Sequence, residues 1–208
     1  MTELVVTLVV GLSRSGKTTF CLRYLNARAR AAGFTAFIFD PLGVMAATCG
    51  LPAAEHPQEL EMALDERDRL IFFDPTLAFP GNRLGAAEWF FRWSYARAPA
   101  LPGRKVLFVD EVWKLCSPQQ IPQPLAEWVQ DGAKWGLECL FATQTPNKLN
   151  STITGQLTEV VSFRLQERNA LEFAEGAGFV GEELKAQPQG MFTALNLFSG
   201  GVRRGKVF

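Results

Sequence analysis

The stretch LVVTLVVGLSRSGKTTF, residues 4–20, decides the fold of this chain. It joins a short apolar, β-branched run to the pattern GxxxxGK[ST], and residues of helical character follow at once. A strand, a glycine-bounded loop and a helix in this order predict a phosphate loop, because the glycines allow a tight turn whose backbone N–H groups point at phosphate oxygens. A chance glycine-rich turn is the alternative, and the flanking strand and helix disfavour it. We therefore expect the chain to bind a nucleoside triphosphate.

The residues of this loop have separate expected roles. Lys17 is expected to reach the phosphate oxygens and to act in catalysis, and Thr18 is expected to ligate Mg²⁺. The loop backbone and the first helical residues supply the other contacts. The predicted ATP-binding set is Gly11, Leu12, Ser13, Arg14, Ser15, Gly16, Lys17, Thr18 and Thr19.

The composition indicates one domain without a dominant charge. The chain has 208 residues, and 21 Lys and Arg side chains balance 21 Asp and Glu side chains. This length predicts a single α/β domain over residues 1–208. Zero net charge excludes a chain-wide attraction to nucleic acid or membranes, so any contact with DNA must be local. No secretory leader or membrane-spanning run is visible, so we expect a cytoplasmic protein that is not secreted and has no transmembrane segment.

Cysteine and histidine offer little chemistry. No CxxC spacing joins the four cysteines, and their places in or beside predicted buried elements favour core thiols over metal ligands or disulfides. They are Cys21, Cys49, Cys116 and Cys139. The single histidine, His56, cannot by itself build a zinc site, and its proline-flanked loop disfavours a His-based triad.

Strands and helices alternate along the chain. Strands are predicted over residues 4–10, 33–41, 70–75, 105–111, 136–144 and 159–165, and helices near residues 57–67, 84–97, 124–134 and 168–178. Such alternation predicts a parallel sheet covered by helices on both faces. Apolar runs on both sides of Ser199, Gly200 and Gly201 predict a terminal hairpin.

Two details of this pattern concern packing. The second and third predicted strands end in Asp-Pro, at Asp40 and Asp74, which suggests parallel strands ending on one edge. The helix over residues 84–97 carries an aromatic face that includes Trp89, Phe90 and Trp93. Packing against the sheet is the favoured explanation of that face, and a subunit contact is a second one that remains open.

A second motif, KVLFVDE at residues 105–111, is an apolar strand that ends in two carboxylates. This places Asp110 at the carboxyl edge of the sheet, where it is expected to hold the Mg²⁺ ligated by Thr18, largely through water. Glu111 points another way and is expected to orient and deprotonate the attacking water. The alternative is that both acids only cap the strand. The pair favours hydrolysis over phosphate transfer to a small molecule.

A third motif, FATQTPNKLNSTI at residues 141–153, runs from a strand into a polar loop. Gln144 lies at the strand's tip, where an amide can accept from the water nucleophile and donate to a γ-phosphate oxygen. A solvent-facing loop amide is the alternative. We predict a catalytic role for Gln144.

GLSRSGKT, VLFVDE and ATQTPNKLNSTI, in this order and separation, resemble the motifs of the HerA/FtsK superfamily of hexameric DNA-pumping ATPases. The resemblance covers Val5 to about Phe179 and implies a P-loop NTPase fold of the ASCE, RecA-like class. Other branches of the superfamily carry extra barrel, membrane or helical domains. The chain is therefore most similar to the genome-packaging ATPases of membrane-containing, tailless double-stranded DNA viruses.

This resemblance implies a homo-oligomeric ring, a hexamer in the family, that hydrolyses ATP between subunits and drives double-stranded DNA into a capsid. A neighbouring subunit would supply a catalytic cation, for which Arg164 and Arg168 are the candidates and Arg14 and Lys134 less favoured substitutes. Capsid vertex or portal proteins are possible partners, and host cytoplasm or virion the expected location.

Contacts with DNA are the least constrained expectation, because solvated polar turns are the usual fate of such residues. Candidates are Asn147, Lys148, Asn150, Arg203, Arg204 and Lys206. Three other functions remain open: a conjugation or mobile-element transfer ATPase, an ATP-binding switch or scaffold with little turnover, and a metabolite kinase. The Asp110-Glu111 pair disfavours the kinase, and Glu111 with Gln144 disfavours the switch.

Overall fold

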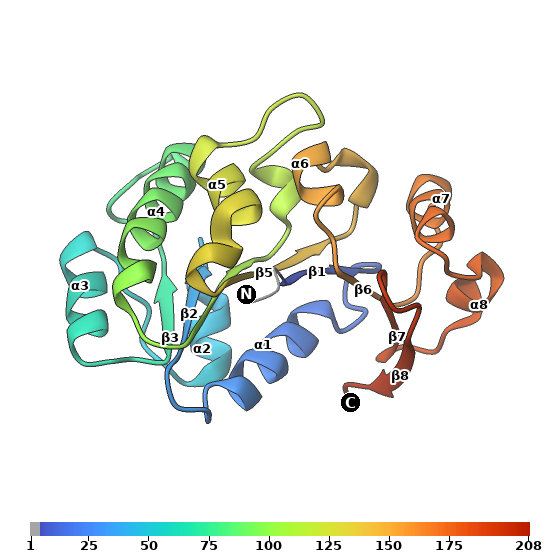
Figure 1. Cartoon of the computed structure of the whole chain (residues 1–208), viewed down its shortest axis with the longest axis horizontal. Helices are drawn as coiled ribbons and strands as arrows, with labels where there is room; N and C mark the ends of the chain where they lie inside the picture. The colour runs from blue at the N-terminus through green and yellow to red at the C-terminus, as the bar shows by residue number, and fades with distance from the viewer. Residues whose placement is uncertain (1–4) are drawn as a thin grey trace.

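An eight-stranded sheet forms the centre of the computed structural model, which describes residues 5–208 (Figure 1). Its strand order is β3-β2-β4-β5-β1-β6-β7-β8. The first six strands in the chain run parallel, and β7 and β8 join by antiparallel pairing. The mostly parallel sheet and the terminal hairpin are both confirmed. The strands are β1 (Val5–Val10), β2 (Phe34–Phe39), β3 (Leu70–Phe73), β4 (Arg104–Val109), β5 (Leu137–Thr143), β6 (Glu159–Ser162), β7 (Met191–Asn196) and β8 (Val202–Lys206).

Helices cover both faces of this sheet (Figure 1). Apolar side chains of α1 (Lys17–Arg28) and α2 (Val44–Cys49) join the core on one face. The remaining helices contribute to the core on the other face. They are α3 (Pro57–Asp65), α4 (Arg83–Arg97), α5 (Gln123–Asp131), α6 (Ser151–Thr154), α7 (Arg168–Gly176) and α8 (Gly181–Ala186).

The central strands are buried on both sides, as their continuous apolar runs predict. In β2, Phe37 and Phe39 belong to the core under α4 and α5, while Ala36 and Ile38 belong to the core under α1 and α2. The alternation of side chains along a strand therefore supplies both cores at once.

Most predicted elements are present with small shifts at their ends. The helix predicted to reach residue 134 ends at Asp131, where a 3₁₀ turn, Gly132–Trp135, continues the chain. The short helices α2, α6 and α8 were not predicted, because four to six residues show no full helical period. Leu4, assigned to the first strand from sequence, lies outside the described residues.

The aromatic face of α4 packs against the sheet, which confirms the favoured explanation. The ring centroids of Phe90 and Phe73 are 5.2 Å apart, and those of Trp93 and Phe37 are 5.7 Å apart. Trp89 lies 5.7 Å from Phe73. Such aromatic pairs add to the apolar area that the helix buries. Whether Trp89 also meets a second subunit stays a prediction.

The cysteines are free thiols, and Cys21 and Cys139 lie in the core. Burial raises the pKa of both thiols, so they stay protonated and inert. Cys49 and Cys116 are half-buried. Among the described residues, no helix combines the length and apolar character needed to span a bilayer.

Candidate active site

The phosphate loop joins β1 to α1 and depends on its two glycines. Gly16 has a φ of 111°, a left-handed conformation, and a Cβ there would lie 2.7 Å from Cγ2 of Val207. A Cβ on Gly11 would lie 2.6 Å from Cβ of Phe163. Gly16 caps α1 with no side-chain hydrogen bond, which leaves the helix's first amides to an anion. The predicted strand, loop and helix are thus all present.

Lys17 is held inside this loop. Its Nζ donates to the carbonyl oxygens of Gly11 and Leu12, at 3.0 Å each, and lies 4.0 Å from Oε1 of Glu111. The side chain is only 6% exposed. Burial lowers the pKa of Lys17, and the negative charges of Glu111 and Asp110 oppose that shift. The ammonium is therefore poorly hydrated, and only oxygens of the loop and of Glu111 surround it in the contacts given above.

The residues present fit a magnesium ion. The hydroxyl of Thr18 donates to Oδ2 of Asp110 at 2.7 Å, so the two predicted metal-holding groups meet across 92 positions of sequence. Between residues 5 and 208 there is no cluster of three or more His, Cys, Asp or Glu side chains able to hold a metal. Such a sparse oxygen set suits Mg²⁺, which keeps several waters and uses substrate phosphates as ligands. Nearby, the buried Oγ of Ser15 has no hydrogen-bond partner.

Glu111 and Gln144 contact each other directly. The amide Nε2 of Gln144 donates to Oε1 of Glu111 at 2.7 Å, and its backbone N–H donates to Oε2 at 3.2 Å. Glu111 itself has a φ of 50°, in the left-handed region. A non-glycine residue is held in that region at a cost of about 1–3 kcal/mol, and such positions concentrate at functional sites.

The order of the strands explains why these motifs meet. β5 pairs with β1 on one side and with β4 on the other, all three parallel. The carboxyl ends of three adjacent strands therefore carry the phosphate loop, Gln144 and the Asp110-Glu111 pair. Ligands of open α/β sheets bind outside such carboxyl ends.

Two contacts at the site were not predicted from sequence. The indole Nε1 of Trp113 donates to Oε2 of Glu111 at 2.8 Å, and Nε2 of Gln189 donates to the carbonyl of Arg14 at 3.3 Å. Trp113 offered a local signal, because it lies only two residues after Glu111 and a buried indole N–H usually finds an acceptor. Gln189 offered none, because it lies 175 positions from Arg14.

The four candidate cations occupy different surroundings. Arg164 lies beside its own phosphate loop: its carbonyl accepts from the N–H of Leu12 at 3.1 Å, and its Nε donates to the carbonyl of Lys185. Arg168 begins α7 and is 89% exposed in a pair with Glu172. Lys134 pairs with Asp131, also at the surface, and Arg14 is exposed with a φ of 59°.

The candidate DNA contacts differ in how exposed their side chains are. Asn150 is 6% exposed, and its amide donates to the carbonyls of Ser117 and Pro118, so it is not available to nucleic acid and that expectation was wrong. Lys148 lies over the ring of Trp113. Asn147 and Lys206 are exposed, and Arg203 and Arg204 form exposed ion pairs with Glu159 and Glu183.

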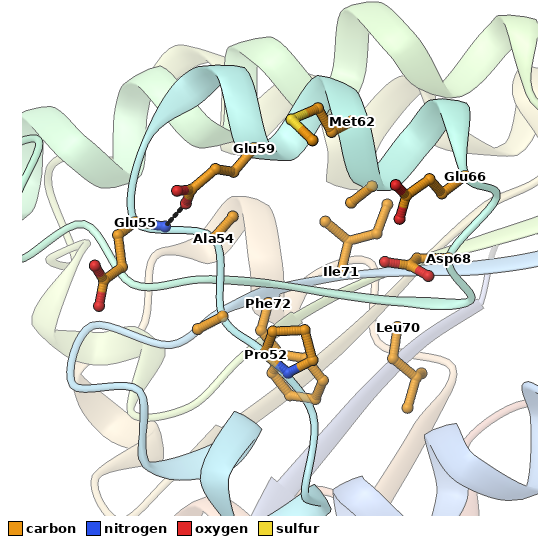
Figure 2. Close-up of a pocket in the computed structure, with 12 residues that line it drawn as sticks. Pro52, Ala54, Glu55, Glu59, Met62, Glu66, Asp68, Leu70, Ile71 and Phe72 are labelled. Atoms are coloured by element: carbon orange, nitrogen blue, oxygen red, sulfur yellow. Dashed lines mark hydrogen bonds between the residues drawn. The ribbon is translucent and has the colours of Figure 1, made fainter.

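A separate hollow of about 300 Å³ lies between α3 and the edge strand β3 (Figure 2). Carboxylates of Glu55, Glu59, Glu66 and Asp68 line it together with apolar side chains. Like charges repel, so this hollow does not suit a polyphosphate. The candidate nucleotide site is therefore the loop at the end of β1.

Comparisons with known proteins place the fold. No protein-family model and no curated protein sequence matches the chain. Solved structures do match over nearly its whole length. One is the genome packaging NTPase B204 from Sulfolobus turreted icosahedral virus 2 in complex with AMPPCP, with a TM-score of 0.74, 18% identity and 99% of each chain covered.

Two further matches come from other proteins. VirB4 of Thermoanaerobacter pseudethanolicus aligns with a TM-score of 0.68 and 12% identity, covering 97% of this chain and 89% of that one. The pCW3 conjugation coupling protein TcpA aligns with a TM-score of 0.62 and 13% identity, covering 98% and 60%. The predicted P-loop NTPase fold is thus confirmed, and the chain shares it with this viral packaging NTPase, VirB4 and TcpA.

Proposed function

We propose that this chain is an ATP-hydrolysing motor that moves double-stranded DNA, and that its cargo is a viral genome entering a capsid. The observation that carries the proposal is the meeting of Lys17, Thr18, Asp110, Glu111 and Gln144 at one edge of the sheet. The packaging NTPase aligns with a TM-score of 0.74, VirB4 with 0.68 and TcpA with 0.62, which supports packaging as the first candidate and conjugative transfer as the second.

The proposed chemistry assigns one task to each group. The amides at the start of α1 and the ammonium of Lys17 bind the phosphates of ATP. Thr18 directly, and Asp110 through water, would hold Mg²⁺, which supplies neutralising charge beside the phosphates. Glu111 takes the proton of the attacking water.

Glu111 is held by its neighbours in this structure. Both of its oxygens accept hydrogen bonds, from Trp113 and from both nitrogens of Gln144. A turn of the Gln144 side chain toward the nucleotide would free a further lone pair of Oε1 for the attacking water. The amide of Gln144 then has its two donors free for a phosphate oxygen, so it couples phosphate binding to release of the base.

The ring and its trans-acting arginine belong to the same proposal. A group that serves a neighbouring subunit must project from the surface, and Arg168 does so from an exposed ion pair that costs little to break. The guanidinium of Arg164 is exposed as well and donates to the carbonyl of Lys185, so both arginines stay candidates. Mixed rings containing Arg168→Ala should lose turnover in proportion to mutant subunits, with Arg164→Ala measured alongside.

The deciding experiment is steady-state ATP hydrolysis with and without long double-stranded DNA, at two salt concentrations. A DNA translocase should turn over faster with DNA, and the gain should shrink at high salt because phosphate contacts release counterions. Lys17→Met provides the inactive control. Hydrolysis that DNA does not change would contradict the motor, and the absence of hydrolysis would favour an ATP-binding switch.

A further inference from the structure

The ring of Phe208 lies beside the phosphate loop with much of its surface open. This side chain is 55% exposed. A Cβ on Gly16 of the loop would lie 3.3 Å from Cε1 of Phe208, and a Cβ on Gly190 would lie 2.7 Å from Cε2. One side of the ring thus packs on the backbone of two glycines, and the rest faces solvent.

The chain around this ring is fixed. Val207 is 3% exposed, and its N–H donates to the carbonyl of Gly190 at 2.9 Å. Its side chain belongs to the core under α1 and α2, and it directly follows the edge strand β8, which leads to the carboxyl end of the chain (Figure 1). The buried side chain and the backbone hydrogen bond of Val207 therefore anchor the backbone next to Phe208.

A second contact ties the same region to the loop. Gln189 directly precedes Gly190, and its exposed side chain donates to the carbonyl of Arg14. Two segments from the end of the chain, residues 189–190 and 207–208, thus border a loop formed by residues 11–18. None of the hydrolysis machinery described above uses them.

An exposed aromatic ring beside the phosphate loop can stack on another flat ring. The loop recognises phosphates only, while the base of a bound nucleotide extends beyond them and exposes a flat π-face. Bases stack on aromatic side chains whatever their sequence, and an anchored ring loses little entropy in doing so. A single exposed phenylalanine without such surroundings would need no explanation.

We propose that Phe208 is the stacking platform for the base of the bound nucleotide, with Gln189 bordering the same position. This inference rests on the proposed ATP binding and adds the group that distinguishes a nucleoside triphosphate from a bare polyphosphate. It assigns the carboxyl end of the chain to the binding site, about 190 residues beyond the motif that holds the phosphates.

Isothermal titration calorimetry of the whole chain tests this with two probes, Mg·ATP and magnesium tripolyphosphate. Phe208→Ala should weaken ATP binding about 30-fold, the middle of the range for loss of one base stack, and leave tripolyphosphate binding unchanged. Phe208→Trp should retain ATP binding. Phe198→Ala, which removes an 81% exposed ring from the turn between β7 and β8, is the matched control and should change neither.

Other outcomes contradict the inference in distinct ways. Equal weakening of both probes by Phe208→Ala would mean that the ring only supports the loop, and unchanged ATP binding would remove it from the site. If the unaltered protein bound neither probe, the result would contradict the proposed ATPase function, and with it the proposed role of Phe208.

Discussion

The neighbouring strands β2 and β4 each end in an aspartate, and the two side chains do different things. The strands pair in parallel with Phe39 opposite Val109, so Asp40 and Asp110 follow equivalent positions. Asp40 is 2% exposed, and its Oδ2 accepts from the N–H of Ala46 in α2 at 2.8 Å. Asp110 accepts instead from the hydroxyl of Thr18.

The role of each aspartate is decided by the segment of chain that its side chain faces. After Asp40 the chain turns through Gly43 into α2, whose first amides satisfy the carboxylate. After Asp110 the left-handed Glu111 turns the chain away, and the phosphate loop supplies the partner. Aspartates at equivalent positions therefore give a structural acid after one strand and a candidate metal-holding acid after its neighbour.

The largest expected effect is that of Glu111→Gln. The amide keeps the shape but cannot accept a proton, so ATP turnover should fall by about 10²–10⁴-fold, the usual contribution of a general base. ATP binding, measured by calorimetry, should persist. Glu88→Gln on α4, which removes another partly exposed carboxylate, serves as control. Unchanged turnover in Glu111→Gln would show that the base lies elsewhere.

Asp110→Asn and Asp40→Asn test the comparison itself. Removing an outer-sphere metal partner typically weakens metal binding by about 10–100-fold, so Asp110→Asn should raise the Mg²⁺ concentration for half-maximal turnover by that factor. Asp40→Asn should leave it unchanged. Titrations of hydrolysis against Mg²⁺ measure both variants. Equal shifts would contradict the assignment of the metal to Asp110 and not to Asp40.

Trp113→Phe should have a smaller effect. It removes one hydrogen bond to Glu111 and keeps an aromatic ring, so kcat should fall by about three- to tenfold with little change in KM. Trp135→Phe removes an indole that is 47% exposed and provides the control. A change in KM alone would assign Trp113 to substrate binding rather than to positioning the base.

Asp40→Ala should act on stability and not on turnover. It leaves the N–H of Ala46 without its acceptor, so the free energy of unfolding should fall by about 1 kcal/mol, the usual loss for a helix-capping group. Urea unfolding and ATP hydrolysis measure the two quantities. Lost hydrolysis in a variant that remains folded would place Asp40 in the active site.

The smallest effect concerns pH. Burial raises the pKa of Asp40 above its ordinary value of 3.8, although the amides of α2 oppose the shift. The folded protein therefore binds this proton more tightly than the unfolded chain does. The resulting stabilisation is present below 3.8 and is lost as the pH rises through the raised pKa. Asp40→Asn should remove this part of the pH dependence of unfolding, and an unaltered profile would contradict it.

Much of the fold followed from contiguous stretches of sequence. The phosphate loop, the strand before Asp110 and the strand before Gln144 all lie where their apolar runs predicted them. Short elements such as α2 escaped prediction, because they carry too few residues for a periodic signal. Asn150 was misassigned because its buried partners, the carbonyls of Ser117 and Pro118, lie more than 30 positions away.

The sequence by itself determined the local geometry of the phosphate loop, because adjacent residues encode both its glycine-bounded turn and the start of α1. Only the tertiary structure decided which groups meet there. The insertion of β5 between β1 and β4 brings Gln144 to Glu111, and the terminal hairpin brings Phe208 to Gly16. These contacts join residues 33 to about 190 positions apart, and they depend on strand order and packing that no local pattern encodes.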